Sequence, residues 1–244
     1  MPNGAGTMTG MYMKNERGFT LVELLATIGA GIILMAAIYT AVTFGYRSSV
    51  AVERKVTALE DARAALELMS TEIRMASYNP NDIPNYQNIW QNATCGGTHS
   101  GVMGYRGVQV ADANNIMVQM DITEDTDVND PNEIIRYAYD AANQRITRST
   151  NCGGAQPFLG DIVANVNQRT VRVINNDLNI PVFRYFNGTG TEIQAASLPG
   201  LIPDIRRIDI TLAVETEHVD PNTNQRRRLI YSTSVIPRNH APPL

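Results

Sequence analysis

The sequence predicts an α+β fold in which one long N-terminal helix packs on an antiparallel β-sheet. Three observations lead to this prediction. An uncharged apolar run extends from Leu24 to Phe44, helical spacing of apolar residues then continues to about Ser77, and alternating strand-like segments fill the second half. Because the strands follow the helix and do not alternate with further helices, an antiparallel sheet is expected.

The apolar run is long enough to be a membrane segment. A helix needs about 20 apolar residues to cross a hydrocarbon core of about 30 Å. Lys14 and Arg17 precede the run, and the positive-inside rule places such residues on the cytoplasmic side. The chain beyond Phe44 is then expected to lie outside the inner membrane.

Glu23 is an unusual residue at the start of this segment. Placing a charged side chain in a membrane helix costs about 2.5–3.5 kcal/mol on insertion scales, so a carboxylate there indicates a function and requires a partner. A free amine on a neighbouring copy would be such a partner. In a secretory signal the cleavage site follows the apolar region, whereas here the natural cleavage position precedes it.

The segment Gly18-Phe19-Thr20-Leu21-Val22-Glu23-Leu24-Leu25 resembles the prepilin-type cleavage and methylation motif of type IV pilins and type II secretion pseudopilins. The resemblance implies that prepilin peptidase cuts between Gly18 and Phe19 and methylates the new amino group of Phe19. Glu23 would then pair with the terminal amine of an adjacent subunit during assembly. The alternative is an uncleaved membrane anchor with a chance glutamate.

The resemblance implies four segments. Residues 1–18 form the leader, 19–46 the membrane and assembly half of the helix, 47–78 its amphipathic half, and 79–244 a globular antiparallel-sheet domain. Met13 is an alternative start to Met1 and would give a shorter leader.

The amphipathic half shows one apolar stripe on an otherwise charged helix. There is no proline between Phe19 and Asn79, and Pro80 is expected to end the pattern. The stripe consists of Val52, Val56, Leu59, Ala62, Leu66, Met69, Ile73 and Ala76.

Six strands are predicted from alternation and flanking turn residues. They are 116–120, 133–139, 144–149, 182–186, 207–215 and 228–236.

Some of these strands show a narrower resemblance. The run from Ile134 to Asp140, the segment 145–148 and the closing segment 235–239 are similar to PilW-like minor pilins and J-type pseudopilins. Three features depart from major pilins: Thr40 replaces a common kinking proline, the cysteines lie mid-chain, and the globular part is large. These departures favour a minor subunit of a type IV pilus that primes assembly at the tip. A J-type pseudopilin of type II secretion is the alternative, and a tip adhesin or DNA-binding subunit is a third.

Cys95 and Cys152 are the only cysteines. Two cysteines outside the cytoplasmic membrane predict one disulfide, because that compartment is oxidising. Two free thiols are the alternative. A zinc site is not expected, since neither cysteine has a second ligand at the usual spacing.

An acidic run from Asp121 to Glu133 lies between two predicted strands. Oxygen ligands at alternate positions suit calcium, which takes six to eight oxygens. The candidate ligands are Asp125, Asp127, Asn129 and Asp130, although the run departs from the EF-hand pattern. The alternative is a solvated acidic turn without a cofactor.

The remaining charged residues do not indicate a catalytic or nucleic-acid site. The net charge is −4, and the triplet Arg226-Arg227-Arg228 is better explained as a solvated strand edge than as a DNA contact. His99, His218 and His240 are scattered, without a metalloprotease or nucleophile motif. No enzymatic activity is expected. The expected partners are prepilin peptidase, other pilins or pseudopilins, the inner-membrane assembly platform and membrane lipid, and no nucleic acid is expected.

Overall fold

The computed structural model describes residues 18–80, 89–90, 106–125, 127–128, 130–160 and 169–240. The chain divides into two compact units, one ending at Arg47 and the other beginning at Ser48. Helix α1 (Leu21–Arg74) begins in the first unit, where apolar side chains such as Ile33 and Met35 are largely exposed. By length and composition α1 is able to cross a membrane.

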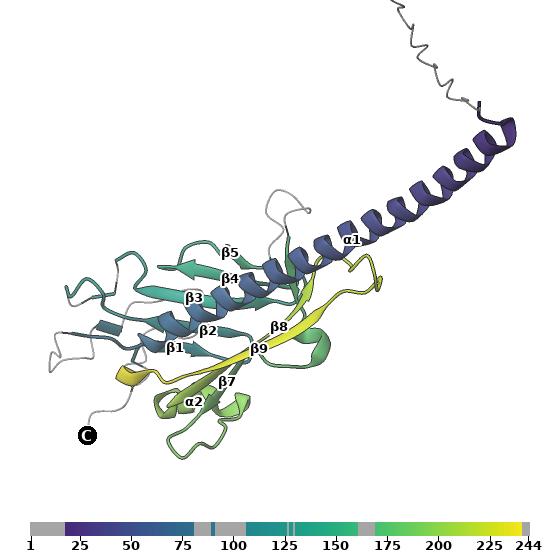
Figure 1. Ribbon diagram of the computed structural model, residues 1–244. Helices are drawn as coiled ribbons and strands as arrows, with labels where there is room; N and C mark the ends of the chain where they lie inside the picture. Colours follow the sequence, from purple (N-terminus) through teal and green to yellow (C-terminus); the bar gives the residue numbers. More distant parts are fainter. Residues whose placement is uncertain are drawn as a thin grey trace, which may run out of the picture. The chain divides into compact units, whose positions relative to one another are not determined.

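The second unit contains two antiparallel sheets (Figure 1). The first sheet has the order β1-β2-β3-β4-β5, with strands Val108–Ala111, Asn115–Gln119, Ile134–Asp140, Arg145–Thr150 and Gln156–Leu159. In the second sheet, the central strand β8 pairs with the three others. Its strands are β6 (Val171–Val173), β7 (Phe183–Phe186), β8 (Arg207–Thr216) and β9 (Arg228–Val235). A short helix, α2 (Leu198–Leu201), lies between β7 and β8.

The part of α1 within the second unit packs against both sheets. The first residues of the predicted stripe do not join the core, because Val52 and Val56 are exposed and Leu59 is only partly buried. The rest of the predicted stripe is buried, namely Ala62, Leu66, Met69, Ile73 and Ala76, and Ala58 and Ala65 are buried with them. They share one core with Ile116 and Tyr137 of the first sheet and with Ile210 and Leu212 of the second. The predicted α+β class, with a long helix on antiparallel strands, is therefore confirmed.

The six predicted strands correspond to β2, β3, β4, β7, β8 and β9, with bounds that differ by at most one residue. The sequence prediction missed β1, β5 and β6, which have only three or four residues each. It also placed the strands in one sheet, whereas the structure has two.

The helix ends at Arg74, three residues earlier than predicted, because Ser77 adopts a left-handed backbone conformation. The Ser77 amide donates to the Gln119 carbonyl at 2.9 Å, and the Ser77 hydroxyl lies 3.0 Å from Nδ1 of His240. The hydroxyl also accepts from the Gly107 amide at 2.9 Å. These bonds join the end of the helix to β2 and to the C-terminal segment.

His240 is buried, and its ring nitrogens both have partners. Nε2 lies 2.8 Å from the Ile202 carbonyl and therefore donates to it, which leaves Nδ1 to accept from the Ser77 hydroxyl. Burial lowers the pKa of His240 to about 4; the bond to Ile202 opposes this shift, and the charges of Arg206 and Arg106 add to it.

We expect the stability of the fold to fall as the pH drops from about 6.5 to about 4. The unfolded chain, with a His240 pKa of about 6.5, binds this proton more readily than the folded chain. The contribution of neutral His240 to the free energy of unfolding is therefore complete above pH 6.5, and about 3 kcal/mol of this free energy is lost by pH 4. Chemical unfolding of the full chain at a series of pH values measures this loss. His240→Asn should show a flatter profile, and an unchanged profile in that variant would contradict the assignment.

A charged cluster joins α1 to the first sheet. Arg148 donates to Glu72 through Nε at 3.1 Å and through Nη2 at 2.7 Å, and the Tyr137 hydroxyl also donates to Glu72. The Glu72 and Arg148 side chains are only 14% and 22% exposed. Burial and the hydrogen bond to Glu72 raise the pKa of Tyr137 well above its ordinary value, so Tyr137 remains a donor.

Replacing Glu72 with alanine is expected to destabilise the fold by about 2–3 kcal/mol, because Arg148 and Tyr137 would lose a charged hydrogen-bond partner within a mostly buried cluster. Chemical unfolding of the full chain measures the change. Glu67→Ala removes an exposed carboxylate from the same helix and serves as the control. Equal losses in the two variants would mean that the cluster does not hold the helix on the sheet.

Candidate functional site

The candidate processing site lies immediately before the first turn of α1. Gly18, Phe19 and Thr20 are exposed and non-helical, and the Phe19 side chain is 82% exposed. The peptide bond between Gly18 and Phe19 therefore has no helical hydrogen bonds to lose when a peptidase binds it.

The first turn of α1 forms a reciprocal capping box between Thr20 and Glu23. The Glu23 amide donates to the Thr20 hydroxyl oxygen at 3.2 Å. In return, Oε2 of Glu23 accepts from the Thr20 amide and from the Thr20 hydroxyl, both at 3.1 Å. This arrangement satisfies amide groups that the start of a helix otherwise leaves without partners, and it places a negative charge at the positive end of the helix dipole.

The capping box gives Glu23 a role within its own helix, in addition to the predicted role in assembly. The pattern Thr-x-x-Glu before an apolar run was a visible signal for it. In the described part of the chain, all hydrogen bonds to the Glu23 side chain use Oε2. The second oxygen, Oε1, is therefore available to a group from another molecule.

The acidic loop between β2 and β3 is organised by the buried carboxylate of Glu133. Its Oε1 accepts from the amides of Ile122 at 2.9 Å and Thr123 at 3.1 Å, and from the Thr123 hydroxyl at 3.0 Å. Its Oε2 accepts from the Asp130 amide at 3.0 Å. The loop is thus closed by hydrogen bonds from its own backbone.

The carboxylates that converge in this loop differ from the predicted calcium ligands. Asp121, Asp125 and Glu133 offer oxygens that lie within 4.8 Å of one another. Asp125 alone belongs to both sets. Asp130 accepts from the Thr123 hydroxyl, the Asp127 amide donates to Asp125, and Asn129 lies outside the described residues. Calcium binding at Asp125, Asp127, Asn129 and Asp130 stays a prediction.

The predicted disulfide has one end in the described structure. Cys152 lies in the turn after β4, where both Asn151 and Cys152 have positive φ angles. Cys95 lies outside the described residues. The pairing of these two cysteines therefore stays a prediction.

The arginine triplet at the start of β9 interacts with neighbouring acidic groups. Arg228 forms an ion pair with Glu215 at 2.8 Å, and Arg227 forms one with Asp220 at 3.1 Å. Arg226 lies 3.8 Å from Glu215. These carboxylates offset the positive charge of the triplet, which weakens its case as a phosphate-binding patch.

Trp90 is also not an exposed recognition residue. It is 2% exposed and packs with Ile89, Met117, Val128 and Ile134 in a second apolar cluster. An adhesin or DNA-binding subunit would require an exposed aromatic or basic patch, and the structure places the Trp90 side chain in the interior.

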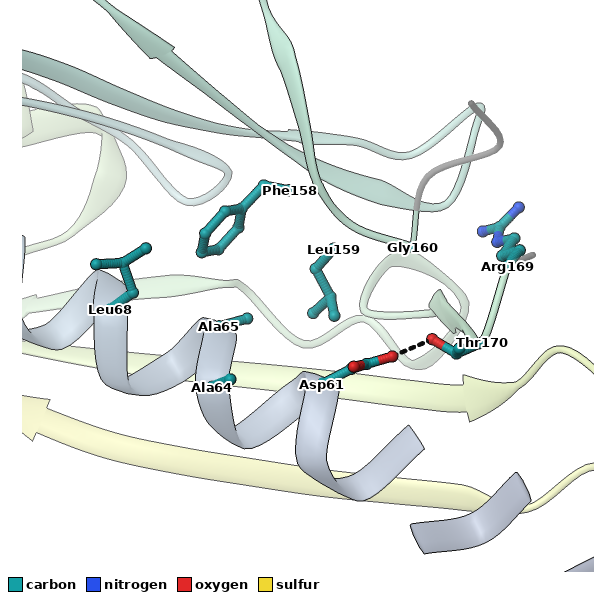
Figure 2. Close-up of a pocket in the computed structure, with 9 residues that line it drawn as sticks. All are labelled: Asp61, Ala64, Ala65, Leu68, Phe158, Leu159, Gly160, Arg169 and Thr170. Carbon is teal, nitrogen blue, oxygen red and sulfur yellow. Dashed lines mark hydrogen bonds between the residues drawn. The ribbon is translucent and has the colours of Figure 1, made fainter. Parts of the chain in front are cut away.

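A pocket of about 400 Å³ lies beside α1 in the second unit (Figure 2). Leu68 of α1 and Phe158 of β5 line its apolar side, and Asp61 accepts a hydrogen bond from the Thr170 hydroxyl at one end. Arg169 donates to the carbonyls of Asn143 and Gln144. These polar groups connect structural elements and leave a mainly apolar pocket.

Residues 13–39 match the family model described as the prokaryotic N-terminal methylation motif. No curated protein and no solved structure gave a significant match to the chain. The matched range includes the Gly18–Phe19 bond, the Thr20–Glu23 capping box and the first part of the apolar helix. This motif, together with the fold, supports a type IV pilin or pseudopilin precursor that prepilin peptidase processes, that the apolar helix anchors in the inner membrane and that assembles with other pilins.

Proposed function

We propose that the chain is a minor pilin that is cleaved between Gly18 and Phe19 and primes the assembly of a type IV pilus at its tip. The observation that carries the proposal is the Glu23 carboxylate, which lies in the first turn of an apolar helix directly after the cleavage position. Residues 19–46 would hold the precursor in the inner membrane. The domain that follows would lie on the periplasmic side and later on the pilus surface.

Cleavage creates the charge that Glu23 requires. Hydrolysis of the Gly18–Phe19 bond converts the Phe19 amide nitrogen into an α-amine, whose ordinary pKa of about 7.7–8.0 keeps it protonated at neutral pH. Methylation leaves this amine basic. Oε2 of Glu23 remains bonded to Thr20 within its own helix, and Oε1 accepts a hydrogen bond from the amine of a neighbouring subunit.

This ion pair would set the position of one helix against the next. Helices that move from lipid into a bundle gain little from the hydrophobic effect, because lipid tails are as apolar as the side chains. Packing of apolar side chains such as Ile28, Ile32 and Met35 would therefore allow one helix to take several positions along the next. A carboxylate and an ammonium in an apolar setting stabilise only the position in which they meet.

The features that favour a minor subunit lie outside the motif. Thr40 replaces a common kinking proline, the cysteines lie mid-chain and the globular domain is large. The same features fit a J-type pseudopilin, whose short filament serves protein export. The adhesin or DNA-binding alternative is less favoured, since Trp90 is buried and the arginine triplet has acidic partners.

Counting and measuring surface filaments in cells that lack this chain tests the proposal. A priming subunit predicts fewer filaments of normal length, and restored numbers when the chain is supplied again. Normal filament numbers with lost export of a secreted protein would indicate a pseudopilin. Normal filament numbers with lost surface binding would indicate an adhesin. Either of the last two results would contradict the priming role.

A further inference from the structure

Strand β9 forms an outer edge of the second sheet. It pairs with β8 along its whole length, from Val235 opposite Ile208 to Arg228 opposite Glu215. In the described ranges, no strand pairs with the other side of β9. With eight residues it is twice as long as β1 or β5, the edge strands of the first sheet.

The hydrogen bonds of β8 show which groups of β9 face the open edge. The Thr211 amide donates to the Val182 carbonyl and the Ala213 amide to the Asn175 side chain, both away from β9. In an antiparallel pair, when one residue points its backbone N–H and C=O groups away from the partner strand, the residue opposite it does the same. Thr211 lies opposite Ser232, and Ala213 lies opposite Ile230. By this alternation, every second residue of β9 points its backbone N–H and C=O groups to the open side, namely Arg228, Ile230, Ser232 and Ser234. We call these outward groups the β9 edge.

From Leu229 onward, the β9 edge lacks the features that normally prevent strand addition. Proteins protect edge strands by proline, charge, bulges or short length. Strand β5 contains Pro157, and β1 has an irregularity between Val108 and Val110. By contrast, the run from Leu229 to Ile236 contains no charged residue and no proline. The arginine triplet protects only the start of this strand.

An exposed apolar face of α1 lies beside this edge. The guanidinium of Arg63 lies 5.8 Å from the ring centre of Tyr231 in β9. Val52, Val56 and Leu59 share this face of α1 with Arg63, because they are spaced three or four residues apart. Val52 and Val56 are 58% and 42% exposed. A strand added to β9 would therefore find both backbone partners and an apolar surface for alternate side chains.

We propose that the β9 edge binds an extended segment of a neighbouring, non-identical pilin-like subunit. The segment would be uncharged over about six residues and flanked by carboxylates, and its backbone would pair with the β9 edge as in other cases of strand addition. This inference rests on the proposed function, because it assumes that the chain assembles with other subunits.

The charges around β9 favour carboxylates on the partner and disfavour a second copy of this chain. If the β9 strands of two copies paired antiparallel with their centres aligned, the arginine triplet of one copy would lie close to Arg238 of the other. Like charges on paired strands destabilise the pairing. The side chains of Arg227 and Arg228 remain 53% and 64% exposed despite their ion pairs. A guanidinium has five N–H donors, so an incoming carboxylate would still find partners.

Ser232→Pro in the full chain tests the inference, since it removes one outward N–H and leaves the bonds between β8 and β9 in place. The amount of chain in the filament fraction is measured relative to the membrane fraction. We expect processing to be normal and incorporation to fall about tenfold, because a backbone bond is lost and the proline ring obstructs the added strand. Ser232→Ala keeps the N–H and should incorporate normally. Ile230→Pro provides a second variant with an outward N–H, should Ser232→Pro fail to fold.

Normal incorporation of a folded proline variant would overturn the role of the β9 edge. Absence of the wild-type chain from filaments would overturn the proposed function, and this inference with it. Two differently tagged copies that copurify in the wild type, but not with Ser232→Pro, would overturn the assignment of a non-identical neighbour.

Discussion

Glu23→Gln is expected to leave cleavage between Gly18 and Phe19 intact but to reduce incorporation into filaments about 100-fold. Glutamine can take the place of glutamate in a capping box, so the bonds to Thr20 are retained while the charge is lost. The neighbour's amine would then lack a counter-charge in an apolar setting, at a cost of about 2.5–3.5 kcal/mol. Quantifying processed chain in the membrane and filament fractions measures the effect.

Thr20→Val separates the two roles of Glu23. Valine removes the hydroxyl of the capping box but leaves the carboxylate, so helix stability should fall by about 1 kcal/mol while the charge pair remains possible. Incorporation should therefore be affected much less than by Glu23→Gln. If the glutamine variant assembled as well as the wild type, Glu23 would serve only as a helix cap.

Gly107→Ala is expected to destabilise the fold by about 3–5 kcal/mol. A Cβ atom at this position would overlap the Ser77 nitrogen and the Gln119 carbonyl oxygen, which are backbone atoms and cannot swing aside. The overlap would also disturb the Ser77–Gln119 bond and the bond from the Gly107 amide to the Ser77 hydroxyl. Chemical unfolding of the full chain measures the change.

Gly188→Ala provides the matched control for this substitution. Its added Cβ would meet only the Arg206 side chain, at 3.7 Å, which is an ordinary contact. A change within about 0.5 kcal/mol is expected there. If Gly107→Ala proved equally mild, the close approach of Gly107 to Ser77 and Gln119 would not contribute to stability.

The sequence was sufficient to predict the elements with strong periodic patterns. The apolar stripe of α1 and the alternation in β8 each extend over several turns or residue pairs, so local pattern identified them. Strands β1, β5 and β6 were missed because three or four residues show too little alternation. The division into two sheets depends on strand pairing far along the chain, which local pattern does not reveal.

The sequence could predict only those parts of the candidate site whose residues lie close together along the chain. The cleavage position and Glu23 lie within one short motif, whereas the bond between Ser77 and His240 joins residues 163 positions apart. The acidic loop shows the same limit. Alternation within the run indicated Asp125 and Asp127, but chain folding brings Asp121 and Glu133 to Asp125.

The most direct test of the proposed processing and assembly is the intact mass and N-terminal sequence of the chain recovered from the filament fraction of native cells. We expect a chain that starts at Phe19 and carries a methyl group on its terminal amine. A chain that retains Gly18 and the residues before it would contradict this expectation and leave a membrane-anchored sheet domain in place of a pilin.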